Sequence, residues 1–240
     1  MKQASAVSAG ARVIARMLVA GPVVRSRRWV LIVKLRVLGW MSRSTVDVQI
    51  DKSARIGRRI VVQFGSKGHN VIRIGPGCKI SDGVRFRLYG GTIDLGPKVD
   101  VRGNAVLSIA GGRLVLDGPN NLSWGVTVHC AESIHLAKFA HVAEYSTIVD
   151  NSHYYTAPDV WSYHNTRTAP IELEQDVWVC PKATITSGVR IGDHTIVASN
   201  TVVVKDVPPG VLISGVPGKV VRGLDLPWLG AGLDGRPVDE

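Results

Sequence analysis

The 240-residue sequence contains few cysteines, with three in all, at positions 78, 130 and 180. They stand far apart and lack the close paired spacing of structural zinc sites. An odd number in no regular arrangement also gives no disulfide framework. We therefore expect a protein of the reducing cytoplasm that needs no bound metal.

Aromatic residues and long apolar runs are scarce too. Aromatics make up 6% of the chain, and the apolar stretch at residues 29–40 is interrupted by Lys34 and Arg36. A helix that crosses a bilayer needs about 20 apolar residues, so we expect no transmembrane span. The 26 glycines and the many valines and isoleucines instead predict short strands and tight corners.

No acidic residue precedes Asp47. Residues 1–46 carry nine basic side chains and so contribute most of the net charge of +10. Two interpretations stay open: a solvated basic segment, or attraction to an anionic membrane surface or a lipid-phosphate substrate. Nucleic acid is the least favoured partner, because the segment matches no nucleic-acid-binding motif.

A six-residue repeat is the strongest pattern in the chain. From residue 173 to residue 203, every sixth residue of the chain is aliphatic, and the residue four places after each of them is small or β-branched. The two series are Leu173, Val179, Ile185, Ile191, Val197 and Val203, and Val177, Ala183, Val189, Thr195, Thr201 and Val207. Average residue usage gives such a pattern a chance on the order of one in a million.

Weaker copies of the repeat start near Ile74, Leu95 and Leu136. Its phase slips between the copies, which predicts short insertions near residues 64–71, 88–94, 108–115 and 118–134. A period of six fits neither a helix nor a half-exposed strand, but it is a known β-helix period. Three hexapeptides would close a triangular coil of about 18 residues, with the aliphatic side chains inside and strands stacked about 4.8 Å apart.

The chain resembles the hexapeptide-repeat acyltransferases, and within them the galactoside and maltose O-acetyltransferase branch. The similar stretches are PIEL at 170–173, VWV at 177–179, GVRIGD at 188–193, KDVPPG at 205–210 and GVPGKV at 215–220. The resemblance implies an all-β, left-handed parallel β-helix. It also implies transfer of an acetyl or other short acyl group from acyl-CoA, with acetyl-CoA as the donor, to a hydroxyl or amine of a sugar, glycan or glycolipid precursor.

Three parts of the chain are expected. Residues 1–46 form a basic segment with two short helices, at 13–20 and 29–38, separated by Gly21-Pro22. Residues 47–222 form the β-helix, with an excursion loop at 149–172, and residues 223–240 form a flexible tail. The loop is rich in polar and aromatic residues, and a loop of this length in a repeat array is usually functional.

The resemblance places the catalytic base at His153, where the excursion begins. An imidazole can take the proton of an acceptor hydroxyl as that hydroxyl attacks a thioester, so no covalent enzyme intermediate is required of Cys180. Asp150 could orient the imidazole or bind the acceptor, or be a solvated surface residue. Asn151 and Trp124 are further acceptor-binding candidates, with Asn120 and Asn121 beside Trp124.

The resemblance also places the donor in a groove between the subunits of a homotrimer. The cofactor-binding candidates are Trp178, Ser199, Lys205, Pro217, Lys219 and Arg222. Lysine and arginine suit phosphate recognition because their charge is fixed. Pro181 departs from the family, since it offers no backbone N–H to the thioester oxygen.

Two other functions stay open. A metal-dependent hydratase on the same fold is disfavoured because the spacing of His129, His135 and His141 would place them on three different sides of a regular coil. His135 and His153 are separated by one predicted coil and could stack on one edge. A non-catalytic β-helix scaffold would explain the repeat but not the residues of the excursion. The expected location is cytoplasmic, with peripheral contact to the inner face of a membrane through residues 1–46.

Overall fold

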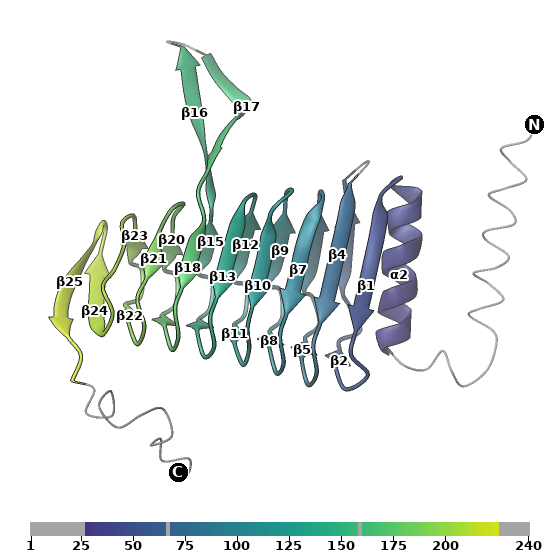
Figure 1. The fold of residues 1–240 in the computed structure, drawn as a ribbon, viewed down its shortest axis with the longest axis horizontal. Helices are drawn as coiled ribbons and strands as arrows, with labels where there is room; N and C mark the ends of the chain where they lie inside the picture. Colours follow the sequence, from purple (N-terminus) through teal and green to yellow (C-terminus); the bar gives the residue numbers. More distant parts are fainter. Residues whose placement is uncertain (1–26, 66–67, 158–159, 226–240) are drawn as a thin grey trace, which may run out of the picture.

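A computed structural model describes residues 27–65, 68–157 and 160–225, and its fold is the predicted left-handed parallel β-helix. Three sheets form the sides of a prism, and a long hairpin projects from one of its edges (Figure 1). The chain passes through the sheets in the order A, B, C and then returns to A.

Sheets A and C have seven strands each. Sheet A consists of β1 (Thr45–Ile50), β4 (His69–Ile74), β7 (Gly91–Leu95), β10 (Arg113–Leu116), β13 (Ser133–Leu136), β18 (Ile171–Leu173) and β21 (Arg190–Ile191). Sheet C consists of β3 (Val61–Phe64), β6 (Arg85–Leu88), β9 (Val106–Ile109), β12 (Thr127–Cys130), β15 (Thr147–Val149), β20 (Thr184–Ile185) and β23 (Val202–Val203).

Sheet B has nine strands and closes the C-terminal end of the prism. It consists of β2 (Arg55–Ile56), β5 (Lys79–Ile80), β8 (Asp100–Val101), β11 (Asn121–Leu122), β14 (His141–Val142), β19 (Trp178–Val179), β22 (Ile196–Val197), β24 (Val211–Gly215) and β25 (Gly218–Gly223). The last two strands pair antiparallel and end the run of parallel pairing.

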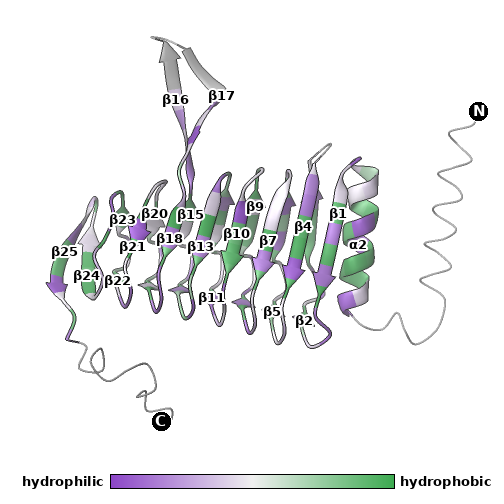
Figure 2. Cartoon of the chain, viewed as in Figure 1, coloured by the Kyte–Doolittle hydropathy of each residue, from purple (hydrophilic) through white to green (hydrophobic). Residues whose placement is uncertain are grey.

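The hexapeptide positions form the core, as predicted. All twelve residues of the two series are buried, from Leu173 at 0% exposed to Val207 at 7%. The small residues occupy the inner corners, where Ala183 and Thr201 leave room for the chain to turn. Along β6 and β10, buried residues alternate with exposed or half-buried ones, and this is the pattern expected when one face of each strand points into the prism. Figure 2 shows hydrophobic and hydrophilic residues mixed along the strands.

Over the first half of the molecule the coils contain extra residues, as the slips in the phase of the repeat predict. Ile80 pairs with Ile56 and Leu107 pairs with Phe86, and each pair is separated along the chain by more than three hexapeptides. The predicted coil of three hexapeptides occurs only after the hairpin, where Ile191 pairs with Leu173. The early strands of sheets A and C extend beyond their hexapeptides, and the extra residues lie where the chain passes from sheet C to sheet A, within the predicted insertions.

The helix α2 (Arg27–Met41) covers the open N-terminal end of the prism (Figure 1). Its residues Leu31, Ile32 and Leu35 are buried, and they belong to the same core cluster as the apolar residues of the first coil. The Arg28 side chain donates to the carbonyl of Ile50 at 2.9 Å. The second predicted helix is therefore confirmed, and the first one, at 13–20, lies outside the described residues. Among the described helical residues, none form a segment long and apolar enough to cross a membrane.

Candidate active site

The excursion is a β-hairpin rather than an irregular loop. The chain leaves sheet C after β15, forms β16 (Asn151–Ala157) and β17 (Val160–Thr168), and re-enters sheet A at β18. The two hairpin strands pair antiparallel, with His153 opposite Thr166. The hairpin rises from the corner between sheets C and A, well clear of the prism (Figure 1).

Asp150 anchors the base of this hairpin. Its side chain is 0% exposed, so the interpretation as a solvated residue is wrong. One carboxylate oxygen accepts from the backbone N–H of Ala131 at 2.7 Å, and the other accepts from that of Glu132 at 2.8 Å. The Asn151 amide donates to the same carboxylate at 3.1 Å. Because both oxygens are hydrogen-bonded and the side chain has no exposed surface, this carboxylate is not accessible to an acceptor substrate.

The backbone of Asp150 also ties the hairpin to the next coil. Its carbonyl accepts from the Ser187 hydroxyl at 2.9 Å and from the Ala169 N–H at 3.0 Å. The point where the chain leaves the prism is thus bonded to the point where it returns. We infer that the first residues of β16 have a fixed position relative to sheet C.

His153 follows this anchor closely and is exposed on β16. Its Nδ1 atom is 3.5 Å from the Thr166 hydroxyl on the facing strand. The imidazole lines a surface groove of about 680 Å³ between the hairpin and the outer face of sheet C. The other lining residues are Arg87, Tyr89, Ser108, Ala110, His129, Cys130, Ala131, Asn151, Thr166 and Thr168. Two of the predicted site residues, His153 and Asn151, therefore share one groove.

His129 is a second imidazole in this groove, and our reading of the sequence missed it as a site residue. Burial lowers the pKa of His129, and the positive charge of Arg87 lowers it further, against the opposing effect of Asp150. The side chain is therefore neutral at pH 7. Strand alternation alone could have predicted its outward direction, because Val128 and Cys130 on either side are buried.

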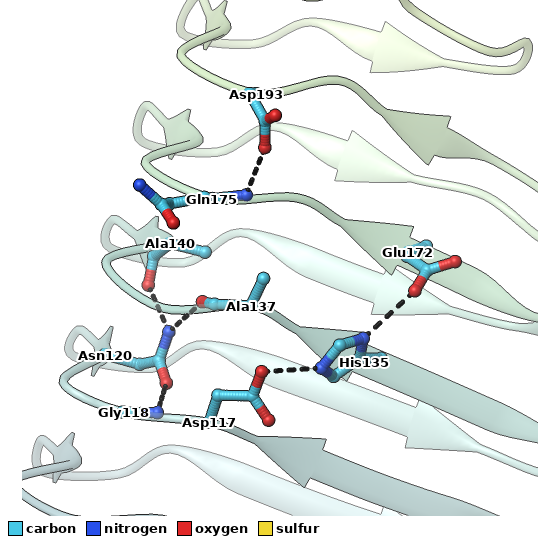
Figure 3. A network of polar contacts seen from close by, with 9 residues as sticks. All are labelled: Asp117, Gly118, Asn120, His135, Ala137, Ala140, Glu172, Gln175 and Asp193. Carbon is cyan, nitrogen blue, oxygen red and sulfur yellow. Dashed lines mark hydrogen bonds and ion pairs between the residues drawn. The ribbon is translucent and has the colours of Figure 1, made fainter. Parts of the chain in front are cut away.

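His129, His135 and His141 lie on three different sheets, as predicted, in β12, β13 and β14. The proposed stacking of His135 with His153 is wrong. His135 lies on the outer face of sheet A, where its Nε2 is 3.1 Å from Asp117 and its Nδ1 is 3.0 Å from Glu172 (Figure 3). Burial lowers its pKa, but the bonds to Glu172 and Asp117 outweigh burial and the net pKa is raised.

No three His, Cys, Asp or Glu side chains within the described ranges are grouped so that they could hold a metal ion. Burial raises the pKa of the Cys180 thiol. Burial and the nearby Asp150 carboxylate raise the pKa of Cys130 to about 12. Both thiols are thus protonated at neutral pH, and neither is an activated nucleophile.

The residues proposed beside the acceptor on sheet B lie away from this groove. Trp124 is 47% exposed at the corner between sheets B and C, with the Arg102 guanidinium stacked 4.5 Å from its ring centre. Asn120 is a structural residue: it is buried and bonds to Gly118, Ala137 and Ala140 (Figure 3). Within one chain, neither side chain is among the described residues that line the groove with His153.

The donor candidates are only partly assembled in one chain. Trp178 and Arg222 line a common cavity of about 500 Å³ on sheet B, together with Asp176, His194 and Leu224. Ser199, Lys205, Pro217 and Lys219 are not among the described lining residues of that cavity. Lys205 follows β23, and Lys219 lies in β25 opposite Ser214. Trp178 is on sheet B and the hairpin is at the corner of sheets C and A. Within one chain, the predicted donor site around Trp178 is therefore separate from the groove that contains His153.

Comparison with known proteins supports the repeat directly. The sequence profile of the family described as bacterial transferase hexapeptide (six repeats) matches residues 170–205. A 2,3,4,5-tetrahydropyridine-2,6-dicarboxylate N-acetyltransferase from Clostridium perfringens is 43% identical over 56 residues, covering 23% of this chain and 24% of that protein. The galactoside O-acetyltransferase of Escherichia coli is 40% identical over 53 residues, covering 22% of this chain and 26% of that protein. The matched segment thus spans about a quarter of the length of these curated relatives.

Solved structures show the same fold. A polysialic acid O-acetyltransferase is 21% identical with a TM-score of 0.56, covering 74% of this chain and 85% of that chain. An N-acyltransferase variant from Bacillus cereus, solved with dTDP-4-amino-4,6-dideoxyglucose and coenzyme A, is 14% identical with a TM-score of 0.50. The match covers 74% of this chain and 87% of that one.

Proposed function

We propose that this hexapeptide-repeat protein is an acyltransferase that moves an acetyl or other short acyl group from acyl-CoA to a sugar. The acceptor atom is a hydroxyl or an amine of a sugar, glycan or glycolipid precursor. The observation that carries the proposal is His153, an imidazole held on an anchored hairpin above a groove lined by hydroxyl and amide groups. The acyltransferase names of the matched relatives support the same chemistry.

In the proposed reaction His153 acts as general base. Its Nε2 takes the acceptor proton as the acceptor oxygen or nitrogen attacks the thioester carbon. The tetrahedral adduct then expels coenzyme A, and the imidazolium returns the proton to the leaving sulfur. In this scheme Nδ1 carries the proton and donates it to the Thr166 hydroxyl, which leaves Nε2 as the proton acceptor. Such base catalysis contributes typically about 10²–10⁴-fold.

The acyl-CoA site belongs, in this proposal, to the interface of a homotrimer. Trp178 and Arg222 form its core because they already share a cavity. Ser199, Lys205, Pro217 and Lys219 complete it along the groove between copies. A second copy is required because, in a single chain, Trp178 and His153 lie on different faces of the prism. Pro181 cannot donate a hydrogen bond to the thioester oxygen, so that donor must be another group.

Peripheral contact with an anionic membrane remains part of the proposal. Arg27 and Arg36 of α2 are exposed, as are Trp40 and Met41 at its C-terminal end. Leu31, Ile32 and Leu35 of α2 pack on the first coil, so this helix is needed to cover the core. A test of membrane binding should therefore remove residues 1–26 and keep the helix.

The proposal is tested by thiol release from acetyl-CoA with a panel of sugars and nucleotide sugars. The wild type is expected to release coenzyme A only when an acceptor is present. His153→Ala should lower kcat by about 10²–10⁴-fold with little change in the KM for acetyl-CoA. Thiol release that no sugar stimulates would contradict the proposed activity.

A further inference from the structure

The groove under the hairpin has a floor made by one column of outward side chains on sheet C. Arg87 in β6 pairs with Ser108 in β9, and Ser108 pairs with His129 in β12. Neighbouring strands lie about 4.8 Å apart, so Arg87 is about 10 Å from His129 along the column. Beyond His129 the column reaches β15 and the hairpin that carries His153. A ligand in this groove therefore spans from the imidazoles to the guanidinium.

Arg87 gives this groove its charge. It is the one side chain of permanent charge among the described lining residues, and no carboxylate is among them. Arg87 is a half-buried residue, and its guanidinium donates through Nη2 to the exposed Tyr89 hydroxyl at 3.2 Å. A guanidinium has five N–H donors, so this bond leaves donors for a ligand.

The Asp150 carboxylate lies at the base of the hairpin but does not line the groove. Asp150 is fully buried, and its two oxygens accept from backbone N–H groups and from Asn151. His129 adds no positive charge at neutral pH, because burial and Arg87 both lower its pKa. The groove thus combines one fixed positive charge at one end with neutral hydrogen-bonding groups at the other.

We infer that the acceptor is an anionic sugar, whose carboxylate or phosphate binds Arg87 while its reacting group lies at His153. Guanidinium groups bind both anions through paired, charge-assisted hydrogen bonds. A groove of about 680 Å³ is within the size range of small-molecule sites. This inference rests on the proposed function and names the substrate class of the same site.

The test compares three acceptors that differ in charge: methyl glucuronoside, glucose 1-phosphate and neutral methyl glucoside. The wild type is expected to have a KM at least tenfold lower for one or both anionic sugars than for the neutral one. Arg87→Gln should raise the anionic KM by about ten- to a hundredfold and leave kcat and the KM for acetyl-CoA within about threefold. The two anionic arms separate a carboxylate site from a phosphate site.

Arg85→Gln is the matched control. Arg85 lies on the same strand β6 and is exposed, but it is not among the described lining residues of the groove. Its kinetic constants should stay within about twofold of the wild type. Equal KM values for charged and neutral sugars would overturn the inference, and so would an Arg87→Gln effect on acetyl-CoA alone, which would assign Arg87 to the donor.

Failure of the proposed function would look different. In that case no acceptor stimulates thiol release. Anion binding is then measured directly, by titrating the protein with methyl glucuronoside and with glucose 1-phosphate. Binding that is lost in Arg87→Gln and retained in Arg85→Gln supports the anion site without any turnover. Binding that is absent, or equal in all three proteins, contradicts it.

Discussion

Replacing Asp150 by Ala should destabilise the protein strongly although the side chain is small and touches no ligand. The substitution removes the acceptors of two backbone N–H groups, those of Ala131 and Glu132, at a site with no exposed surface. A buried donor left without a partner costs roughly 1–3 kcal/mol. Two such donors give an expected loss of about 2–6 kcal/mol in the free energy of unfolding, a large part of the total stability of a typical domain.

Asp150→Asn should lie between Ala and the wild type. Asparagine keeps the size of the side chain and can accept one N–H through its Oδ1 atom. Its amide nitrogen then faces the second N–H, so one donor stays without a partner. The expected loss is about half of that for Asp150→Ala.

The assay is urea denaturation of the wild type and both variants, combined with amide hydrogen exchange at Ala131 and Glu132. Both amides should lose protection in Asp150→Ala, and kcat should fall because the hairpin that positions His153 is no longer anchored. Asp82→Ala is the control: Asp82 accepts one backbone N–H, from Arg58, at an exposed site, and its loss should cost less than about 1.5 kcal/mol. Equal losses in Asp150→Ala and Asp82→Ala would refute this reasoning.

Three other outcomes follow from the same structure. Glu172 and Asp117 raise the folded-state pKa of His135, so the protonated side chain stabilises the protein below about pH 6.5, and this effect is lost as the pH rises through the folded pKa. His135→Gln should therefore lower the urea midpoint more at pH 5.5 than at pH 9. An equal or reversed difference would exclude that ion pair. Cys130 has a pKa of about 12 and is buried, so a thiol reagent at pH 8 should leave it unmodified in the native protein, whereas rapid labelling would show that the groove opens to the core. Removing residues 1–26 should weaken co-sedimentation with phosphatidylglycerol vesicles and leave the thermal midpoint nearly unchanged, whereas unchanged vesicle binding would contradict a membrane role for that segment.

The core of the fold could be predicted from the sequence because six-residue spacing maps directly onto the sides of the prism. Leu173, Val179 and Ile185 are buried in successive sheets as their spacing requires. The slips in phase predicted where the early coils carry extra residues, but not the length of each coil. That length depends on how far each strand extends beyond its hexapeptide, and this is decided by pairing with the strands above and below.

The candidate site was predictable only where it coincides with a break in the repeat. The excursion marked His153 and Asn151, and the structure places both in one groove. Arg87 and His129 could not be identified as site residues from the sequence, because they share one column only when coils longer than three hexapeptides are stacked in the correct register. The burial of Asp150 was missed for a related reason, since its partners Ala131 and Glu132 belong to the preceding coil.

The most direct test of the central claim is chemical rescue of the His153→Ala variant. With saturating acetyl-CoA and the best acceptor, the variant should release thiol about 10²–10⁴-fold more slowly than the wild type, and added imidazole should restore part of the rate. His69→Ala, which removes an imidazole bonded to Thr45 on sheet A, should keep the wild-type rate and show no response to imidazole. A His153→Ala rate within a fewfold of the wild type, with no effect of imidazole, would show that His153 is not the base.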